Sequence, residues 1–173
     1  LLPHGTTNTN NFLVLSILTF IKYITSFRLK IPFSSKGRCP YGWTLLGSKC
    51  YEFVINANRA QTWYDANGLC HKTGGKLLEI LDATEQGRIN SMLEQYQDAG
   101  FQEIWLGASD AAQDDTFLWS DNTPIVYYDW DVTMPQTVPG RDDCVSIYTG
   151  KTSQNWETSS CFYLRPYICE LPE

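Results

Sequence analysis

WLGASDAAQDDTFLWSDNTPIVYYDWDVTMPQTVPGRDDCVSIYTGKTSQNWETSSCFYLRPYIC, residues 105–169, is the stretch that decides the fold of this chain. Short strand-like runs at 117–119, 145–148 and 167–169 surround a long segment, 120–143, that has no period. A segment of this length without regular structure is typical of a functional loop or of disorder. Because it carries three aromatic residues and is closed by a cysteine, we interpret it as an ordered loop.

Composition limits the classes of function. A chain of 173 residues is long enough for one domain with a hydrophobic core. Residues 1–51 contain six Lys and Arg and no acid, whereas the remainder holds all 19 acids of the chain. Nucleic-acid binding needs a basic surface, so this acidic body predicts that nucleic acid is not a partner.

The six cysteines form an even set, which is typical of disulfides formed in an oxidising, extracellular compartment. Sequence alone leaves many pairings open. Zinc is the alternative use of cysteine, but the chain has no C-x-x-C pair and only two histidines, His4 and His71. We therefore favour disulfides over a zinc site.

Residues 1–38 differ from the rest of the chain. An apolar run of ten, residues 12–21, ends at Lys22 and is too short to span a bilayer, which needs about twenty residues. Its length suits a secretory signal, although no base precedes it and no small-x-small cleavage site follows. A signal-anchor, which would make the membrane a partner, and an extension foreign to the mature protein are the alternatives. In each case we expect residues 1–38 to lie outside the folded domain, 39–173.

The first half of that domain predicts two helices among short strands. Residues 49–54 alternate polar and apolar side chains, which indicates a strand, and 76–81 are also strand-like. Asn58 with Gln61 resembles a capping box for a first helix that Gly74-Gly75 ends, and Asp82 with Glu85 predicts the start of a second. Two early helices followed by several short strands and one long loop predict an α+β fold.

Several motifs together resemble a C-type lectin-like domain of the long, six-cysteine form. The run 105–108, WLGA, is similar to the family's central WIGL strand. Asp143-Cys144, then Trp156 five residues before Cys161, then Cys169-Glu170, follow the family's C-terminal signature in order and spacing. The tripeptide 134–136, Met-Pro-Gln, falls where the family carries its sugar-specifying EPN or QPD. The resemblance covers about residues 39–173.

This resemblance implies a disulfide-tied scaffold with a long loop that carries the binding site. It also implies three disulfide pairs, Cys39 with Cys50, Cys70 with Cys169, and Cys144 with Cys161. The Met134-Pro135 bond matches a bond that is cis in sugar-binding relatives, and an X-Pro bond has only a weak intrinsic preference for trans.

The chain carries no motif of a known catalytic class. It has no G-x-S-x-G, no H-E-x-x-H and no glycine-rich phosphate loop. Asp142 and Asp143 are adjacent, which fits metal binding or solvation better than a general acid and base on opposite sides of a bond. We predict that the protein is not an enzyme.

The family's main calcium site, carried over by resemblance, falls on Met134, Gln136, Asp142, Glu157 and Thr158. Calcium selects hard oxygen ligands, so the thioether of Met134 is lost as a ligand, and Thr158 offers a hydroxyl where a carboxylate is usual. Gln136, Asp142 and Glu157 keep oxygens and are the predicted ligand-binding residues. We therefore expect calcium binding at this site to be weak or absent. In a shifted loop register, Asp129 or Asp131 would complete the site.

A second set of acids is better suited to calcium. By resemblance, Asp110, Asp114, Asp142 and Asp143 match positions that hold an auxiliary calcium ion and order the long loop. Four converging carboxylates would repel one another without a cation. The alternative is that the two pairs point apart into water as ordinary loop acids.

The resemblance implies an extracellular, secreted recognition module whose partner is a carbohydrate or glycoprotein, bound weakly or through a non-standard calcium site. Calcium-independent binding of a protein ligand is the second hypothesis, and a structural matrix component is the third. Four aromatic residues, Tyr127, Tyr128, Trp130 and Tyr148, suit either of the first two if exposed. Burial is their alternative role, and Trp130 matches a family core position.

Overall fold

The computed structural model describes residues 39–97, 100–141, 143–150 and 154–171. The expectations for residues 1–38 lie outside the described residues and stay predictions. None of the helices in the described ranges has the length and apolarity that crossing a membrane requires. The described elements are β1 (Thr44–Leu46), β2 (Lys49–Val54), η1 (Ala57–Arg59), α2 (Trp63–Lys72), β3 (Lys76–Leu77), α3 (Ala83–Leu93), η2 (Glu94–Tyr96), β4 (Glu103–Ser109), β5 (Leu118–Trp119), β6 (Asp143–Tyr148), β7 (Trp156–Ser160) and β8 (Tyr167–Leu171).

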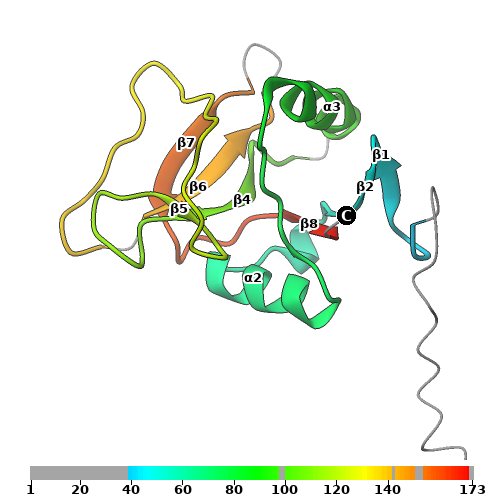
Figure 1. Ribbon diagram of the computed structural model, residues 1–173, viewed down its shortest axis with the longest axis horizontal. Coiled ribbons are helices and arrows are strands. Elements are labelled where there is room, and N and C mark those ends of the chain that lie inside the picture. The colour runs from blue at the N-terminus through cyan, green and yellow to red at the C-terminus, as the bar shows by residue number, and fades with distance from the viewer. Residues whose placement is uncertain (1–38, 98–99, 142, 151–153, 172–173) are drawn as a thin grey trace, which may run out of the picture. The chain divides into compact units, whose positions relative to one another are not determined.

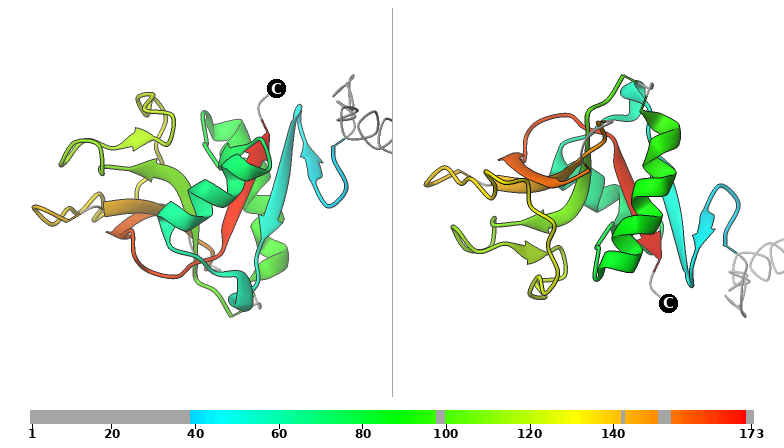
Figure 2. Two further views of the ribbon diagram at one scale, coloured as in Figure 1. Left: turned by 90° about the horizontal axis from the view of Figure 1, so that it is seen from below. Right: turned by 90° about the horizontal axis from the view of Figure 1, so that it is seen from above.

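The strands form one sheet in the order β1-β2-β8-β4-β6-β7, with β3 paired to β8 and β5 to β4. All pairs are antiparallel except the single pair that joins β4 to β8, Trp105 with Tyr167. Figure 1 shows β8 running between α2 and α3. The long loop that follows β5 extends from the opposite side of the molecule to β1 and β2 (Figure 2). The predicted α+β fold is confirmed.

Both helices begin at side-chain caps. Asp82 accepts a hydrogen bond from the backbone N–H of Glu85 at 2.8 Å, which confirms the predicted cap of α3. The prediction for α2 was wrong, because the cap is Thr62, which accepts from the N–H of Asp65. Asn58 instead lies in the short helix η1, where Asn56 is the cap. Asn56 and Thr62 each begin a helix, and the sequence pattern alone did not show which residue in this stretch caps α2.

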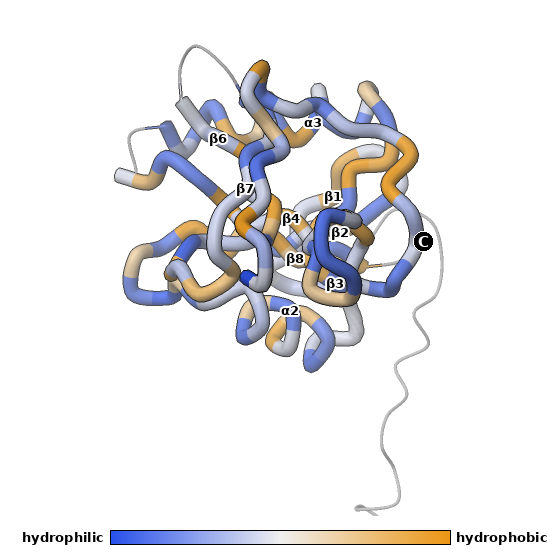
Figure 3. The backbone as a smooth tube through the Cα atoms, turned by 90° about the vertical axis from the view of Figure 1, so that its left-hand side faces the viewer, coloured by the Kyte–Doolittle hydropathy of each residue, from blue (hydrophilic) through white to orange (hydrophobic). Residues whose placement is uncertain are grey.

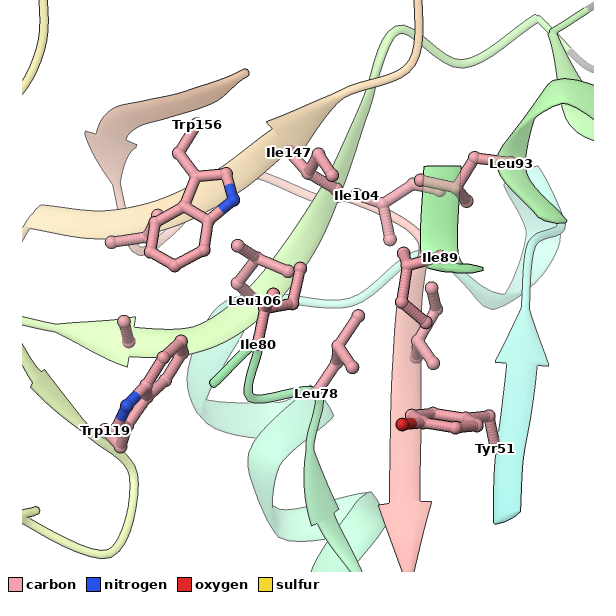
Figure 4. Packing of buried hydrophobic residues seen from close by; sticks show 13 residues of the cluster. Tyr51, Leu78, Ile80, Ile89, Leu93, Ile104, Leu106, Trp119, Ile147 and Trp156 are labelled. Atoms are coloured by element: carbon pink, nitrogen blue, oxygen red, sulfur yellow. The ribbon is translucent and has the colours of Figure 1, made fainter. Parts of the chain in front are cut away.

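The core has two parts. The larger lies among α3, β4, β6 and β7 and includes the buried side chains labelled in Figure 4, with Trp119 and Trp156 in edge-to-face contact at 5.8 Å between ring centroids. The smaller lies between α2 and the sheet and contains two of the disulfides. Figure 3 shows the hydrophobic residues of β4 and β8 in the middle of the molecule. Burial of this apolar surface is the main favourable contribution to folding.

Two glycines allow the backbones to approach closely around β3. A Cβ on Gly75 would lie 2.3 Å from the carbonyl oxygen of Glu170, and one on Gly107 would lie 2.9 Å from that of Leu77. Gly107 is the glycine of the WLGA motif, so this part of the motif serves the packing of β4 on β3.

The three disulfides pair as the resemblance implied, Cys39 with Cys50, Cys70 with Cys169, and Cys144 with Cys161. The first ties the N-terminal end of the domain to β2. The second joins α2 to β8 across 99 residues of sequence, and the third joins β6 to the residue that follows β7. Covalent links therefore hold both the helical scaffold and the strands that border the long loop.

Candidate ligand-binding loop

The middle of the long loop is fixed to the first residue of β7. Trp130 forms an isolated parallel bridge with Trp156. The N–H of Trp156 donates to the carbonyl of Asp129 at 2.8 Å, and the N–H of Asp131 donates to the carbonyl of Trp156 at 2.9 Å. These backbone hydrogen bonds order the centre of a segment that has no secondary structure of its own.

Side chains of this part of the loop divide into an inner and an outer set. Tyr127 and Trp130 pack edge-to-face on Trp156, with ring centroids 6.0 and 5.5 Å apart. They therefore act as core residues, which is the alternative that the sequence left open. On the outside, Tyr128 is 63% exposed and Val132 is 98% exposed. These two exposed side chains are accessible to a ligand.

The tripeptide 134–136 is held by β7. The Met134-Pro135 bond is cis. The hydroxyl of Thr158 donates to the carbonyl of Gln136 at 2.5 Å and accepts from the N–H of Gln136 at 2.9 Å. The same oxygen lies 3.4 Å from the sulfur of Met134. Thr158, predicted to be a poor calcium ligand, therefore bonds directly to the loop.

The remaining predicted ligand-binding residues are only partly brought together. The side-chain amide of Gln136 donates to the carbonyl of Thr133 at 3.2 Å. Glu157 lies next to Thr158 on β7, and burial, with a smaller effect from nearby Glu103, raises the pKa of its carboxyl. Asp142 lies outside the described residues, so its role in ligand binding stays a prediction.

Asp110 and Asp143 are neighbours at the base of the loop. The N–H of Asp143 donates to Oδ1 of Asp110 at 2.7 Å, and the N–H of Asp110 donates to the carbonyl of Asp143 at 3.0 Å. Both side chains are buried, and burial raises the pKa of Asp110. The carboxylate of Asp143 accepts from the N–H of Val138 at 2.7 Å and forms an ion pair with Arg141. These two acids are thus partnered by protein groups.

The other predicted auxiliary ligand, Asp114, is exposed. Its neighbour Asp115 accepts a hydrogen bond from the hydroxyl of Thr137 in the long loop. Within the described ranges, no three or more His, Cys, Asp or Glu side chains are grouped in a way that would hold a metal ion. A cation at Asp143 would have to compete with Arg141 for this carboxylate.

A separate cluster of ionisable residues, which the sequence did not reveal, lies around β8 on the scaffold side. Lys49 donates to Glu85 at 2.9 Å and its Nζ lies 3.6 Å from Glu170. The hydroxyl of Tyr51 donates to the same Glu85 oxygen at 2.5 Å. These residues come from β2, α3 and β8 and lie together through the pairing of β2 with β8.

The cluster continues through β3. Lys76 pairs with Glu79 and lies 3.9 Å from Glu170. Burial raises the pKa of Glu170 to about 8, with Lys49 opposing the shift. The only sequence signal for this cluster was that Lys49 and Glu170 each flank a cysteine that forms a disulfide.

Comparison with known proteins identifies the family of this chain. The model of the Lectin C-type domain matches residues 59–171, which include both helices and the whole long loop. The chain belongs to the C-type lectin family. C-type mannose receptor 2 of Mus musculus is 32% identical over 125 residues, which is 72% of this chain and 8% of that protein. The chain thus spans a small part of the length of this relative.

Two solved structures are similar to this one. The carbohydrate-recognition domain of the mouse scavenger receptor C-type lectin has a TM-score of 0.64 at 26% identity, covering 76% of this chain and 94% of that one. A calcium-independent type II antifreeze protein has a TM-score of 0.64 at 28% identity, covering 79% and 95%. The same fold is thus found in a carbohydrate-recognition domain and in a calcium-independent antifreeze protein.

Proposed function

We propose that residues 39–173 form an extracellular recognition domain whose long loop binds its ligand, a carbohydrate or glycoprotein, without the calcium-bridged mode of the main family site. The observation that carries this proposal is the pair of hydrogen bonds between Thr158 and Gln136. They anchor the tripeptide 134–136 to β7 through protein atoms. This anchor is what supports presentation of the outer loop side chains without a cation.

The outer surface supplies the contacts. Tyr128 offers a flat ring for stacking on a sugar face, and its inner neighbours Tyr127 and Trp130 fix the backbone that carries it. Gln136, within the tripeptide, and Glu157, on β7, are the further hydrogen-bonding groups that we assign to the ligand. Without metal coordination, affinity for a single sugar is expected to be weak, since direct hydrogen bonds to exposed hydroxyls contribute only about 1 kcal/mol each.

The test is a glycan panel probed with the full chain, with calcium and with a chelator. Binding is expected to persist in the chelator. Tyr128→Ala should weaken it about tenfold, the equivalent of about 1.4 kcal/mol. Tyr41→Ala is the matched control, because Tyr41 is fully exposed but lies far from the loop in sequence and outside its contacts. Loss of all glycan binding in the chelator would overturn the proposal.

The loop anchor has its own variant. Thr158→Val keeps the shape of the side chain but removes both hydrogen bonds to Gln136, so it should lower affinity and leave the fold intact. Thr73→Val removes a hydroxyl that bonds to Cys70 at the end of α2 and should leave affinity unchanged. Equal binding by the two variants would show that the anchor does not order the binding surface.

A protein ligand is the second candidate function, and exposed aliphatic side chains on the loop favour it. Val126 is 80% exposed and Val132 is 98% exposed, and neither suits a sugar hydroxyl. A panel with no glycan ligand, together with a protein ligand whose binding is lost in Val132→Asp, would support this function over the first.

A further inference from the structure

A groove lies between two segments that are distant in sequence. One wall consists of Gln97 and residues 100–103, which lead into β4, and the other consists of residues 163–166, which precede β8. The groove has a volume of about 570 Å³, within the range of roughly 300–1,000 Å³ that is typical of ligand pockets. None of the described lining residues belongs to the long loop, so the groove is a separate surface from the one proposed to bind a sugar.

Three consecutive apolar side chains at this groove are exposed to solvent. Phe162 is 64% exposed, Tyr163 57% and Leu164 69%, and the last two line the groove. The ring of Phe162 contacts that of Tyr64 on α2, with centroids 5.8 Å apart, so the apolar surface continues onto the helix. Exposed apolar residues that occur singly are common, whereas contiguous ones mark interaction sites.

This exposure does not come from a loosely held turn. Gln61 and Arg165 exchange two backbone hydrogen bonds, at 2.9 and 3.0 Å, and the carbonyl of Cys161 accepts from the N–H of Trp63 at 2.9 Å. The backbone on both sides of residues 162–164 is therefore fixed to the segment that enters α2. Binding at these side chains costs less conformational entropy than binding at a loop that must first be ordered.

The accessible charge in the groove is mainly negative. Among the described lining residues, the charged ones are Glu103 and Arg165, which form an ion pair. The guanidinium of Arg165 lies over the rings of Trp105 and Tyr163, and its side chain is 11% exposed, whereas that of Glu103 is 26% exposed. Nearby Glu157 adds a second acid, since its pKa is raised by burial and then by Glu103. A cationic group is therefore favoured beside the apolar surface.

We propose that this groove binds a segment of a partner protein that carries a Lys or Arg next to an aromatic or large aliphatic side chain. The apolar side chain of the partner lies against Tyr163 and Leu164, and its cation pairs with Glu103. Exposed Phe162 and Leu164 favour a protein over a sugar, because neither side chain can hydrogen-bond to hydroxyl groups. Aromatic residues and an arginine are also the residue types enriched where protein interfaces gain most of their affinity.

A library of random heptapeptides displayed on phage, selected on the immobilised full chain in chelator, provides the test. We expect enrichment of peptides in which Lys or Arg neighbours Phe, Tyr, Trp or Leu. An enriched peptide, synthesised and titrated into ¹⁵N-labelled chain, should move the backbone resonances of Glu103 and Arg165 and leave that of Tyr128 in place. A selection that enriches no sequence, or only sequences without a base, would overturn the proposal. So would a peptide that moves Tyr128 alone, because it binds at the long loop.

Two variants connect the peptide to the groove, each with a matched control. Leu164→Ser removes apolar surface and should weaken the peptide about tenfold, whereas Leu45→Ser, at an exposed leucine of β1, should not. Glu103→Gln should also cost about tenfold, since hydrogen bonds to charged groups are the stronger ones. Its control is Glu52→Gln, because Glu52 is likewise 26% exposed and paired with an arginine, but lies on β2 outside the groove.

A change in the peptide separates the charge from the fold of the variant. With norleucine in place of its Lys or Arg, the peptide should bind parent and Glu103→Gln equally. A norleucine peptide that binds the parent as tightly as the basic one does would show that Glu103 makes no ion pair with the partner. Glycan binding by Leu164→Ser should equal that of the parent, so failure of the groove and failure of the sugar site give different results.

Discussion

Two groups of acidic residues in this lectin domain are held in different ways. On the scaffold side, Glu79, Glu85 and Glu170 lie around two lysines, Lys49 from β2 and Lys76 from β3. At the base of the long loop, Asp110 and Asp143 bond mainly to backbone N–H groups and to one arginine. The first arrangement links distant elements of the fold, whereas the second orders a local loop. In both groups the buried carboxylates have partners within the protein, which lowers the cost of burying them.

Removing the disulfides is expected to give the largest difference in stability between the two regions. Replacing both Cys70 and Cys169 by Ala is expected to lower the free energy of unfolding by about 4–5 kcal/mol, because this link closes a loop of about a hundred residues. Replacing Cys144 and Cys161 should lower it by about 3 kcal/mol, since that loop is much shorter. Urea unfolding of the two double variants measures both values. Equal losses would show that the loop side contributes as much as the scaffold.

The scaffold cluster predicts a dependence of stability on pH. The pKa of Glu170 is about 8 in the folded protein and ordinarily near 4.5. Between these values the folded protein keeps a proton that the unfolded chain has lost. The protonated Glu170 therefore favours the folded state: this contribution to stability is fully present below pH 4.5 and is lost as the pH rises through about 8. The raised pKa values of Lys49 and Lys76 act only near or above their ordinary value of 10.5.

We expect Glu170→Gln to remove a loss of roughly 4 kcal/mol in the free energy of unfolding between pH 5 and pH 8.5, since this range contains about three pKa units below the folded value and each is worth about 1.4 kcal/mol. Urea unfolding across this pH range measures how the free energy of unfolding changes with pH. Glu94→Gln, at the exposed first residue of η2, is the control and should keep the pH dependence of the parent. A variant with Gln at position 170 that follows the parent curve would mean that Glu170 is ionised throughout.

Much of the fold could be predicted because its signals are local. The strand 49–54 appears with the bounds expected from its alternation, and Asp82 caps α3 as its spacing from Glu85 indicated. The strand expected at 76–81 is only Lys76–Leu77, since Leu78 and Ile80 pack into the core outside the regular strand. Short apolar runs predict burial more reliably than they predict strand length.

The site was harder to predict, because its contacts join residues that are distant in sequence. Thr158 was identified as a weak metal ligand, but no local pattern shows that its hydroxyl reaches Gln136, 22 residues earlier. The ion pair of Arg141 with Asp143 is local but resembles an ordinary loop charge. The cluster at Glu170 depends on the register of β2 with β8. These features follow from tertiary packing and not from composition.

The smallest expected effect is the change in thermal stability on adding calcium, which tests the acids at the base of the long loop. In the described residues, the guanidinium of Arg141 pairs with the carboxylate of Asp143, the residue most needed for the predicted auxiliary site. A cation must compete with this arginine. The parent should therefore gain little thermal stability from calcium, and Arg141→Gln should gain more, by up to about 1 kcal/mol, because a ligand that binds only the folded state stabilises it by mass action.

Melting curves with calcium and with chelator decide this. Arg88→Gln is the matched control, because it removes a guanidinium from an exposed position of α3, outside the long loop. This variant should respond to calcium as the parent does. Adding Asp143→Asn to Arg141→Gln should abolish the gain, since the carboxylate itself is then lost. If calcium stabilises parent, Arg141→Gln and Arg88→Gln equally, the cation binds elsewhere and Arg141 does not compete with it. If calcium stabilises none of them, the auxiliary site at Asp110, Asp114, Asp142 and Asp143 is wrong, and the buried loop acids serve only to bond Arg141 and the backbone.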